Sequence, residues 1–70
     1  MDYTGMTVYT ANAQTKLVDM WTCEGEFKGE YQGEKENLCF LVQGRKMCFL
    51  PKRCVFSDSA KAIAVAKSFD

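Results

Sequence analysis

The sequence predicts a mainly β protein, a five-stranded and strongly bent antiparallel barrel with a C-terminal helix. Short runs rich in β-branched and aromatic residues alternate with turn-forming residues over about 6–56. Gly25 and Gly29 interrupt the longest of these runs, as expected where a strand bends to close a small barrel. An alanine-rich segment at about 58–69 has the spacing of a helix. We therefore expect one domain over residues 1–70.

The first strand is expected at Met6–Ala11, MTVYTA, with a turn at 12–15 leading into the second strand. A helix over Thr10–Trp21 is the competing interpretation. Four apolar residues there share one helical face, namely Ala13, Leu17, Met20 and Trp21. Strand–turn–strand is preferred, and the helix stays open as the alternative.

The second strand shows a clear two-residue period. From Cys23 to Tyr31, small or apolar residues alternate with charged ones. The pattern predicts an antiparallel strand with one face on the core and the other in solvent. On this interpretation the residues facing inward are Cys23, Gly25, Phe27, Gly29 and Tyr31, and the intervening glutamates form a solvated face.

The stretch from Leu38 to Phe56 is the most apolar part of the chain. It predicts a hairpin around the turn Gln43-Gly44-Arg45. A sharp break at Pro51-Lys52-Arg53 follows, and then a short fifth strand at Cys54–Phe56. This break places the two neighbouring cations in a tight turn.

The register of the hairpin stays open. A two-residue turn at Gln43-Gly44 sets Cys39 opposite Cys48, whereas a three-residue turn with a left-handed glycine sets Cys39 opposite Phe49. Pro51 donates no backbone hydrogen bond, so it ends the returning strand or lies at a sheet edge.

The C-terminal segment predicts a capped amphipathic helix. Ser57, Asp58 and Ser59 all offer side-chain oxygens for an N-cap. Ile63 lies at the rim of the apolar face. That face consists of Ala62, Val65, Ala66 and Phe69. A helix this short is marginal alone, so we expect it to pack on the barrel or on a neighbour.

Composition excludes several classes of protein. Nine basic and nine acidic residues cancel, which argues against coating nucleic acid through bulk charge. The sequence has no His, the commonest general base and metal ligand. No nucleophile–base pair or carboxylate pair stands in a recognisable context. We expect a non-catalytic protein without a cofactor.

The four cysteines are Cys23, Cys39, Cys48 and Cys54, and no two of them form a Cys-x-x-Cys pair. All lie in or beside apolar strand patterns, where free Cys behaves as a small buried hydrophobe. Buried free thiols are favoured over disulfides and over a metal site. The N-terminus does not resemble a signal peptide and no apolar run is long enough to span a membrane, so a cytoplasmic protein is expected.

The apolar content is high for a short chain. Of its 70 residues, 47% are hydrophobic, while a core of this size supplies only about 3–5 kcal/mol. Some apolar surface should stay exposed in a monomer, and such patches commonly mark association sites. A homo-oligomer is therefore expected.

The predicted architecture is that of a small SH3-like barrel, and the motifs along it resemble the Sm/LSm family, including bacterial Hfq. In that family a bent, glycine-containing second strand leads to an Asn just before an apolar third strand. The stretch GEFKGEY at 25–31, followed by NLCFL at 37–41, is similar to this motif. MTVYTANAQTKL resembles the family's first strand and turn, and FLPKRCVF resembles its second motif. The resemblance covers about residues 6–56.

The resemblance implies a ring of five to seven subunits in which the fourth strand pairs with the fifth strand of the next subunit. The expected interface residues are Met47, Phe49, Cys54, Val55 and Phe56.

It also implies binding of single-stranded RNA, U-rich or A-rich. Lys52 and Arg53 would line the pore, Asn37 would contact a base edge and Tyr31 would stack on a base. The alternative is a protein-interaction or assembly module without nucleic-acid binding, of the kind that a phage or mobile element encodes.

Overall fold

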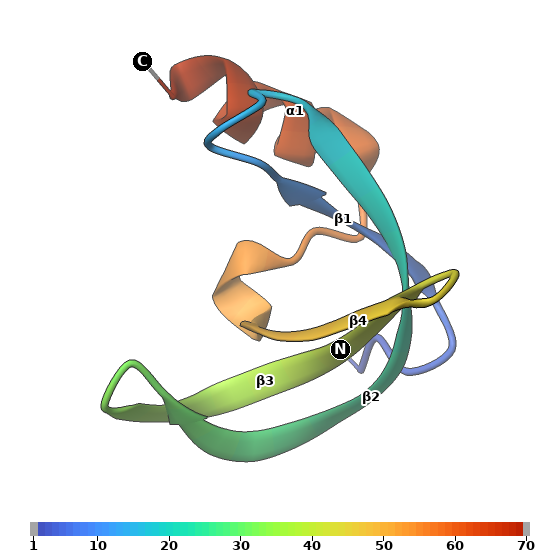
Figure 1. Ribbon diagram of the computed structural model, residues 1–70, viewed down its shortest axis with the longest axis vertical. Coiled ribbons are helices and arrows are strands. Elements are labelled where there is room, and N and C mark those ends of the chain that lie inside the picture. The colour runs from blue at the N-terminus through green and yellow to red at the C-terminus, as the bar shows by residue number, and fades with distance from the viewer. Residues whose placement is uncertain (1, 70) are drawn as a thin grey trace.

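The fold is mainly β, with four antiparallel strands and a C-terminal helix. The computed structural model describes residues 2–69, and residues 1 and 70 of the expected domain lie outside them. The strands β1 (Thr7–Ala11), β2 (Val18–Tyr31), β3 (Glu34–Gln43) and β4 (Lys46–Pro51) form one sheet in chain order. A 3₁₀ helix, η1 (Lys52–Cys54), and α1 (Ser59–Ser68) follow. The sheet curls into a half-barrel with α1 beside β1 (Figure 1).

The segment after β1 is a turn, which confirms strand–turn–strand over the competing helix. Asn12 organises it, because its Oδ1 accepts hydrogen bonds from the N–H groups of Gln14 (2.9 Å) and Thr15 (3.1 Å). Lys16 takes a left-handed backbone conformation with φ of 60°. The chain then enters β2 at Val18.

A β-bulge early in β2 corrects the predicted facing of that strand. Cys23 pairs with Leu41, but the next pair is Gly25 with Phe40, so two residues of β2 advance against one of β3. The alternation therefore shifts by one residue at Glu24. Cys23 faces the core as expected, whereas the inward facing predicted for Gly25, Phe27, Gly29 and Tyr31 is wrong, since the bulge turns them to the opposite face.

The β3–β4 hairpin has a register that neither expected turn provides. Its two-residue turn is Gly44-Arg45, closed by the pair Gln43 and Lys46. Gly44 has φ of 59°, which suits the first central position of a type II′ turn. As a result Cys39 lies opposite Leu50, and Cys48 lies opposite Leu41.

The expected fifth strand is reduced to one bridge. Cys54 belongs to η1, and the N–H of Val55 donates to the carbonyl of Lys52 (3.0 Å) to close this tight turn. Phe56 alone pairs with β1, exchanging backbone hydrogen bonds of 2.8 and 2.9 Å with Tyr9. The described residues thus form four strands and an isolated bridge, because Cys54, the first residue of the expected fifth strand, belongs to η1.

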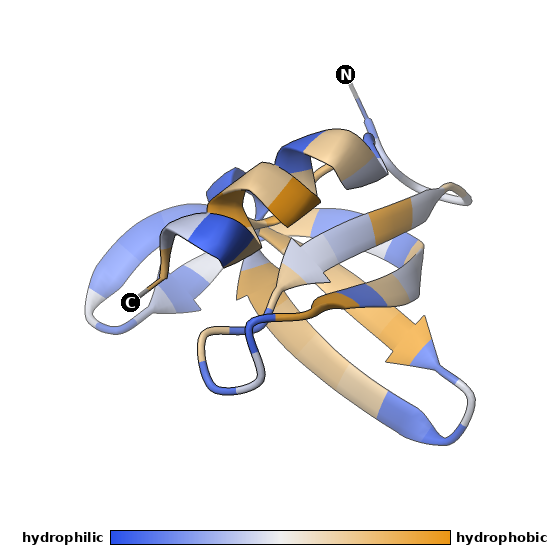
Figure 2. Ribbon diagram, turned by 90° about the horizontal axis from the view of Figure 1, so that it is seen from above, coloured by the Kyte–Doolittle hydropathy of each residue, from blue (hydrophilic) through white to orange (hydrophobic). Residues whose placement is uncertain are grey.

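The core lies inside the curl of the sheet. Its buried members are Val8, Cys23, Cys39, Leu41 and Val55. Figure 2 shows that hydrophobic residues concentrate along the strands and one side of the helix, while the hairpin tips are hydrophilic.

The helix α1 matches the prediction in its position and in its buried face. Asp58 caps it by accepting a hydrogen bond from the N–H of Ala60 (2.8 Å). Ala62 and Ala66 are buried, and Ile63 stays 42% exposed at the rim. Small residues at the buried positions let the helix backbone approach β1 and β2 closely.

Substitution of Gly29 by Ala should destabilise the protein. An added Cβ would lie 2.9 Å from Cδ1 of the buried Leu38 and 3.1 Å from Cε2 of Phe27. Overpacking of this kind costs about 1 to 3 kcal/mol in the free energy of unfolding, measurable by urea titration. Gly25→Ala is the matched control, because a Cβ there meets no heavy atom within 4 Å. Equal stability of the two variants would contradict the tight packing at Gly29.

Candidate functional site

Lys52, expected in an exposed pore, is held against the core side of the sheet. Its Nζ lies 2.8 Å from Oε1 of Glu26 and 4.8 Å from the centre of the Tyr3 ring. The other oxygen of Glu26 accepts a hydrogen bond from the backbone N–H of Tyr3. The hydrogen bond with Glu26 raises the pKa of Lys52. This cation therefore ties the N-terminal segment and η1 to β2.

Arg53 is also paired with a carboxylate. Its Nε lies 2.9 Å from Oε1 of Glu36, and its Nη2 lies 3.4 Å from Oε2 of the same side chain. The arginine side chain remains 63% exposed. Its hydrogen bond with Glu36 is the largest of the effects that raise the pKa of Arg53. The charge of Arg53 is thus compensated at the surface.

The two neighbouring cations point to opposite faces of the sheet. Glu26 pairs with Cys39, whose side chain faces the core, whereas Glu36 is three positions from Cys39 along β3 and so has the opposite facing. The sequence suggested that positive charge gathers at Lys52 and Arg53. The structure separates the two charges and gives each a carboxylate partner.

Tyr31 and Asn37 lie with Arg53 at the end of the β2–β3 hairpin. Tyr31 is close enough to raise the pKa of Arg53, although by less than Glu36 does. Asn37 is exposed and lies opposite Lys28. An open depression at this end is lined by Lys28, Gly29, Glu30, Lys35, Glu36 and Asn37. Three of the four expected RNA contacts therefore lie at one end of the sheet, but Asn37 is two positions from Cys39 and so faces the side opposite to Tyr31 and the Arg53–Glu36 pair.

The five expected interface residues divide into two groups. Met47 and Phe49 are exposed, by 67% and 51%. Val55 is a core residue at 3% exposure, Phe56 pairs with Tyr9 of the same chain, and Cys54 is half-buried in η1. Large exposed apolar side chains in this group come only from β4.

An aromatic row on the outer face of the sheet was missed by the sequence analysis. We define it as Phe27 of β2, Phe40 of β3 and Phe49 of β4. Phe49 contacts both others, edge-on to Phe27 with ring centres 5.4 Å apart and stacked on Phe40 at 5.0 Å. The bulge at Glu24 hid the row, because it moves Phe27 to this face. The signal in the sequence was the apolar run at 38–42 within β3, which requires both faces of the strand to be covered.

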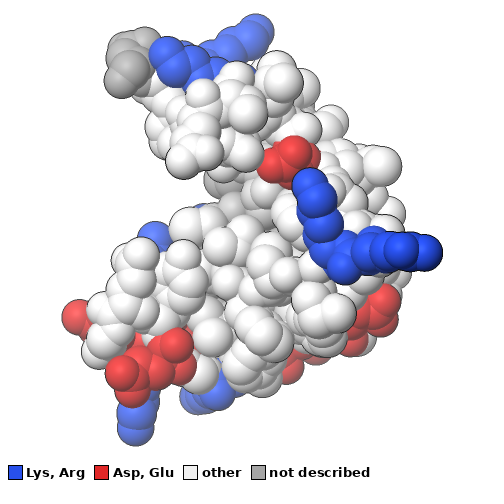
Figure 3. All heavy atoms as spheres, viewed as in Figure 1, with Lys and Arg blue, Asp and Glu red and all other residues white. Residues whose placement is uncertain are grey.

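The aromatic row ends at a free edge of the sheet. In the described sheet β4 has β3 as its one neighbour and forms the margin. Six uncharged residues share the face of the row, and the ion pair of Glu36 with Arg53 borders it at the β2–β3 end. The six are Thr22, Gly25, Leu38, Val42, Met47 and Pro51. In Figure 3, large uncharged areas separate small groups of charged side chains. An uncharged face thus adjoins unpaired strand backbone.

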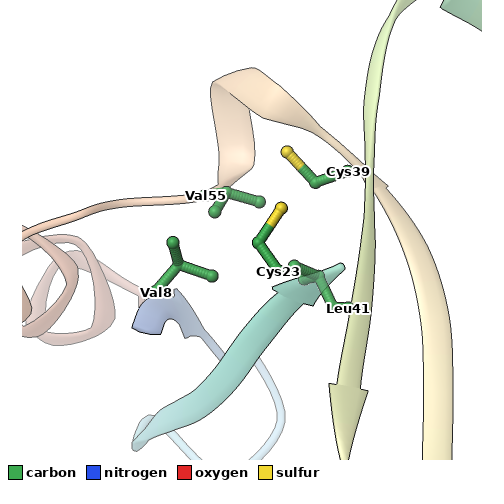
Figure 4. Packing of buried hydrophobic residues seen from close by; sticks show 5 residues of the cluster. All are labelled: Val8, Cys23, Cys39, Leu41 and Val55. Atoms are coloured by element: carbon green, nitrogen blue, oxygen red, sulfur yellow. The ribbon is translucent and has the colours of Figure 1, made fainter. Parts of the chain in front are cut away.

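The four cysteines are free thiols, of which Cys23 and Cys39 are fully buried. Their sulfur atoms both point into the space between β2, β3 and Val55 (Figure 4). Burial, with smaller effects of Cys23 and Glu26, raises the pKa of Cys39 to about 12. Burial also raises the pKa of Cys48, which is half-buried.

Residues 2–69 show neither a metal site nor a membrane-spanning helix. No group of three or more His, Cys, Asp or Glu residues there could hold a metal ion. No helix in this part of the chain has the length and apolar character that crossing a membrane requires.

Comparisons with protein-family models, curated proteins and solved structures found no match to this chain.

We expect the thiols to react in two classes. In the native protein, N-ethylmaleimide should modify Cys54 and Cys48, while Cys23 and Cys39 react only after unfolding in urea. Cys39 should stay unmodified even at pH 9, because burial keeps the reagent from the sulfur and only about one thiol in a thousand is ionised about three pH units below its pKa of about 12. Mass spectrometry of tryptic peptides locates the adducts. Rapid native labelling of Cys39 would show that the core opens.

Proposed function

We propose that this protein is a non-catalytic, self-assembling β-barrel module whose copies associate through the free edge of β4. The observation that carries the proposal is the uncharged outer face ending at β4, where Met47 and Phe49 are 67% and 51% exposed. Exposed strand edges template pairing with another chain, and proteins usually protect them with charge or cover. Here the outward side chains of β4 are apolar, which favours pairing.

The barrel is further proposed to be of the SH3-like, Sm-like type. The order of four bent strands, the break at Pro51 and the return of Phe56 to β1 support this assignment. The short η1 and the motif FLPKRCVF lie at the same place in the chain. The sheet edge at β4 is the edge that the resemblance assigns to contacts between subunits.

Association should appear in light scattering at micromolar concentrations as a species heavier than the 7.9 kDa chain. Because the contact is apolar, it should persist in high salt. Phe49→Glu should abolish it by burying an unpaired carboxylate. Ile63→Glu is the matched control, since Ile63 is similarly exposed but lies on α1. A monomer at every concentration tested would rule the proposal out.

Binding of single-stranded RNA is the second candidate. It is favoured by the placement of Tyr31, Asn37 and Arg53 at one end of the sheet beside an open depression. A ring of five to seven copies, as the Sm resemblance implies, would repeat this set around its axis. The carboxylates of Glu26 and Glu36 weigh against it, since Glu36 occupies Nε and Nη2 of Arg53 and its negative charge repels a phosphate there. Assembly therefore ranks first.

Fluorescence anisotropy with short oligo-U and oligo-A tests this candidate. If Arg53 binds RNA, Glu36→Gln should strengthen binding at least several-fold by releasing the guanidinium, and Arg53→Ala should weaken it. The salt dependence should fall when Arg53 is removed, because phosphate contacts release counterions. Arg45→Ala at the hairpin tip is the control. No binding at low salt would leave assembly as the one function.

A further inference from the structure

The backbone of β4 presents an alternating set of free groups. In a hairpin with a two-residue turn, the pair that closes the turn is hydrogen-bonded, and hydrogen-bonded pairs recur at every second position. Lys46, Cys48 and Leu50 therefore bond to β3. The N–H and C=O groups of Met47 and Phe49 point away from the sheet. Pro51 lies two residues after Phe49, so its backbone nitrogen also points away from β3. That nitrogen carries no hydrogen, so no donor is left unpaired there.

The other margin of the sheet is already occupied. Tyr9 of β1 exchanges both backbone hydrogen bonds with Phe56, and α1 lies against β1. The segment 54–56 offers few donors to a new strand, because the N–H of Val55 bonds to Lys52 and that of Phe56 to Tyr9.

Two stretches of the described sheet thus have an open edge, β4 and residues 24–31 of β2, because β1 pairs only with the first part of β2. The β2 stretch carries Glu24, Glu26, Lys28 and Glu30, and such charges protect an edge from pairing, whereas β4 has a single charge.

The open edge of β4 in one copy of the chain can pair with the same edge in a second copy. We infer that two copies of this chain associate across a two-fold axis by antiparallel pairing of β4 with β4, centred on Cys48. This inference rests on the proposed self-assembly and assigns its geometry. A two-fold contact uses the same surface on both copies, so it closes after two subunits.

The free groups select the register. With Cys48 opposite Cys48 of the second copy, Met47 of each chain pairs with Phe49 of the other, and their N–H and C=O groups are all satisfied. A shift that sets Phe49 opposite itself pairs Met47 with Pro51. Pro51 has no N–H, and its carbonyl already accepts the first hydrogen bond of η1 as the N-cap residue. The register centred on Cys48 therefore uses every free group.

Side chains and charges agree with this register. On the outer face, Phe49 of one copy meets Met47 of the other, which extends the aromatic row across the axis and covers two exposed apolar side chains. Lys46 is the one charged residue of β4. It lies opposite Leu50 of the second copy, so the two ammonium groups stay apart.

The area of the contact sets its strength. Specific interfaces of standard size bury about 800 Å² on each partner, roughly one sixth of the 4937 Å² accessible on this chain. A pair of six-residue strands with flanking Met47 and Phe49 lies in the lower range, which is typical of weak complexes. We expect a dimer with a micromolar Kd.

Oxidative cross-linking of the native chain tests the register. Directly opposed residues in a non-hydrogen-bonded pair have Cα atoms about 4.5 Å apart, within the range of a disulfide. Diamide should therefore join Cys48 to Cys48, taking up the two protons and two electrons that the thiols release. Trypsin yields peptide 47–52, which contains Cys48 as its one cysteine, and peptide 54–61, which contains Cys54. The expected product is a disulfide-linked dimer of peptide 47–52.

A pair of variants at Met47 tests the backbone contact separately. Met47→Pro removes an outward N–H without touching the bonds to β3, so it should raise the Kd at least tenfold. Met47→Leu keeps both the N–H and an apolar side chain and should leave the Kd within about twofold. Circular dichroism checks that each variant is folded, and the cross-link in the unaltered chain does not depend on either variant.

The outcomes separate this inference from the proposed function. A dimer with linked 47–52 peptides supports both. Intermolecular linkage of 47–52 to 54–61 in larger species overturns the two-fold geometry and supports a ring. Association without linkage at Cys48 and without an effect of Met47→Pro also overturns it, while self-assembly stands. A chain that stays monomeric overturns both.

Discussion

The bulge at Glu24 is the constraint on which the arrangement of this protein depends. One extra residue in β2 reverses the facing of everything that follows it in the strand. Glu26 is thereby turned toward the core side, where it holds Lys52 and the N–H of Tyr3. Phe27 is turned outward, where it joins Phe49 and Phe40. The same residue thus creates an internal polar tie and an external apolar face.

These two consequences have opposite effects on the functional candidates. The polar tie removes Lys52 from the surface on which RNA would lie, and Glu36 compensates Arg53 in a similar way. The apolar face adds exposed surface at an open strand edge. The charges of Lys52 and Arg53 are therefore compensated within the chain. The apolar side chains and the backbone hydrogen-bonding groups at the edge of β4 have no partner strand in the described part of the chain. These features support the proposed self-association over the proposed binding of RNA.

The small core explains why the outer face matters. Residues buried inside the curl are few, and two of the five in the main cluster are cysteines. Free Cys packs there as a small hydrophobe, so the inner core contributes modest burial. The larger side chains Phe27, Phe49 and Met47 lie outside it. An association that covers them would add to the stability of a domain this short.

The sequence by itself determined the elements whose signals are local. The helix cap at Asp58, the Asn12 turn, the end of β4 at Pro51 and the glycine in the hairpin turn act within a few residues, so local chemistry identifies them. Register and partners were decided only by the tertiary structure. A bulge depends on how β2 meets β3, and the pairing of Arg53 with Glu36 joins residues that are far apart in the chain. The sequence showed that residues 38–42 of β3 are apolar on both faces of the strand, and only the fold showed that the outer face is partly exposed.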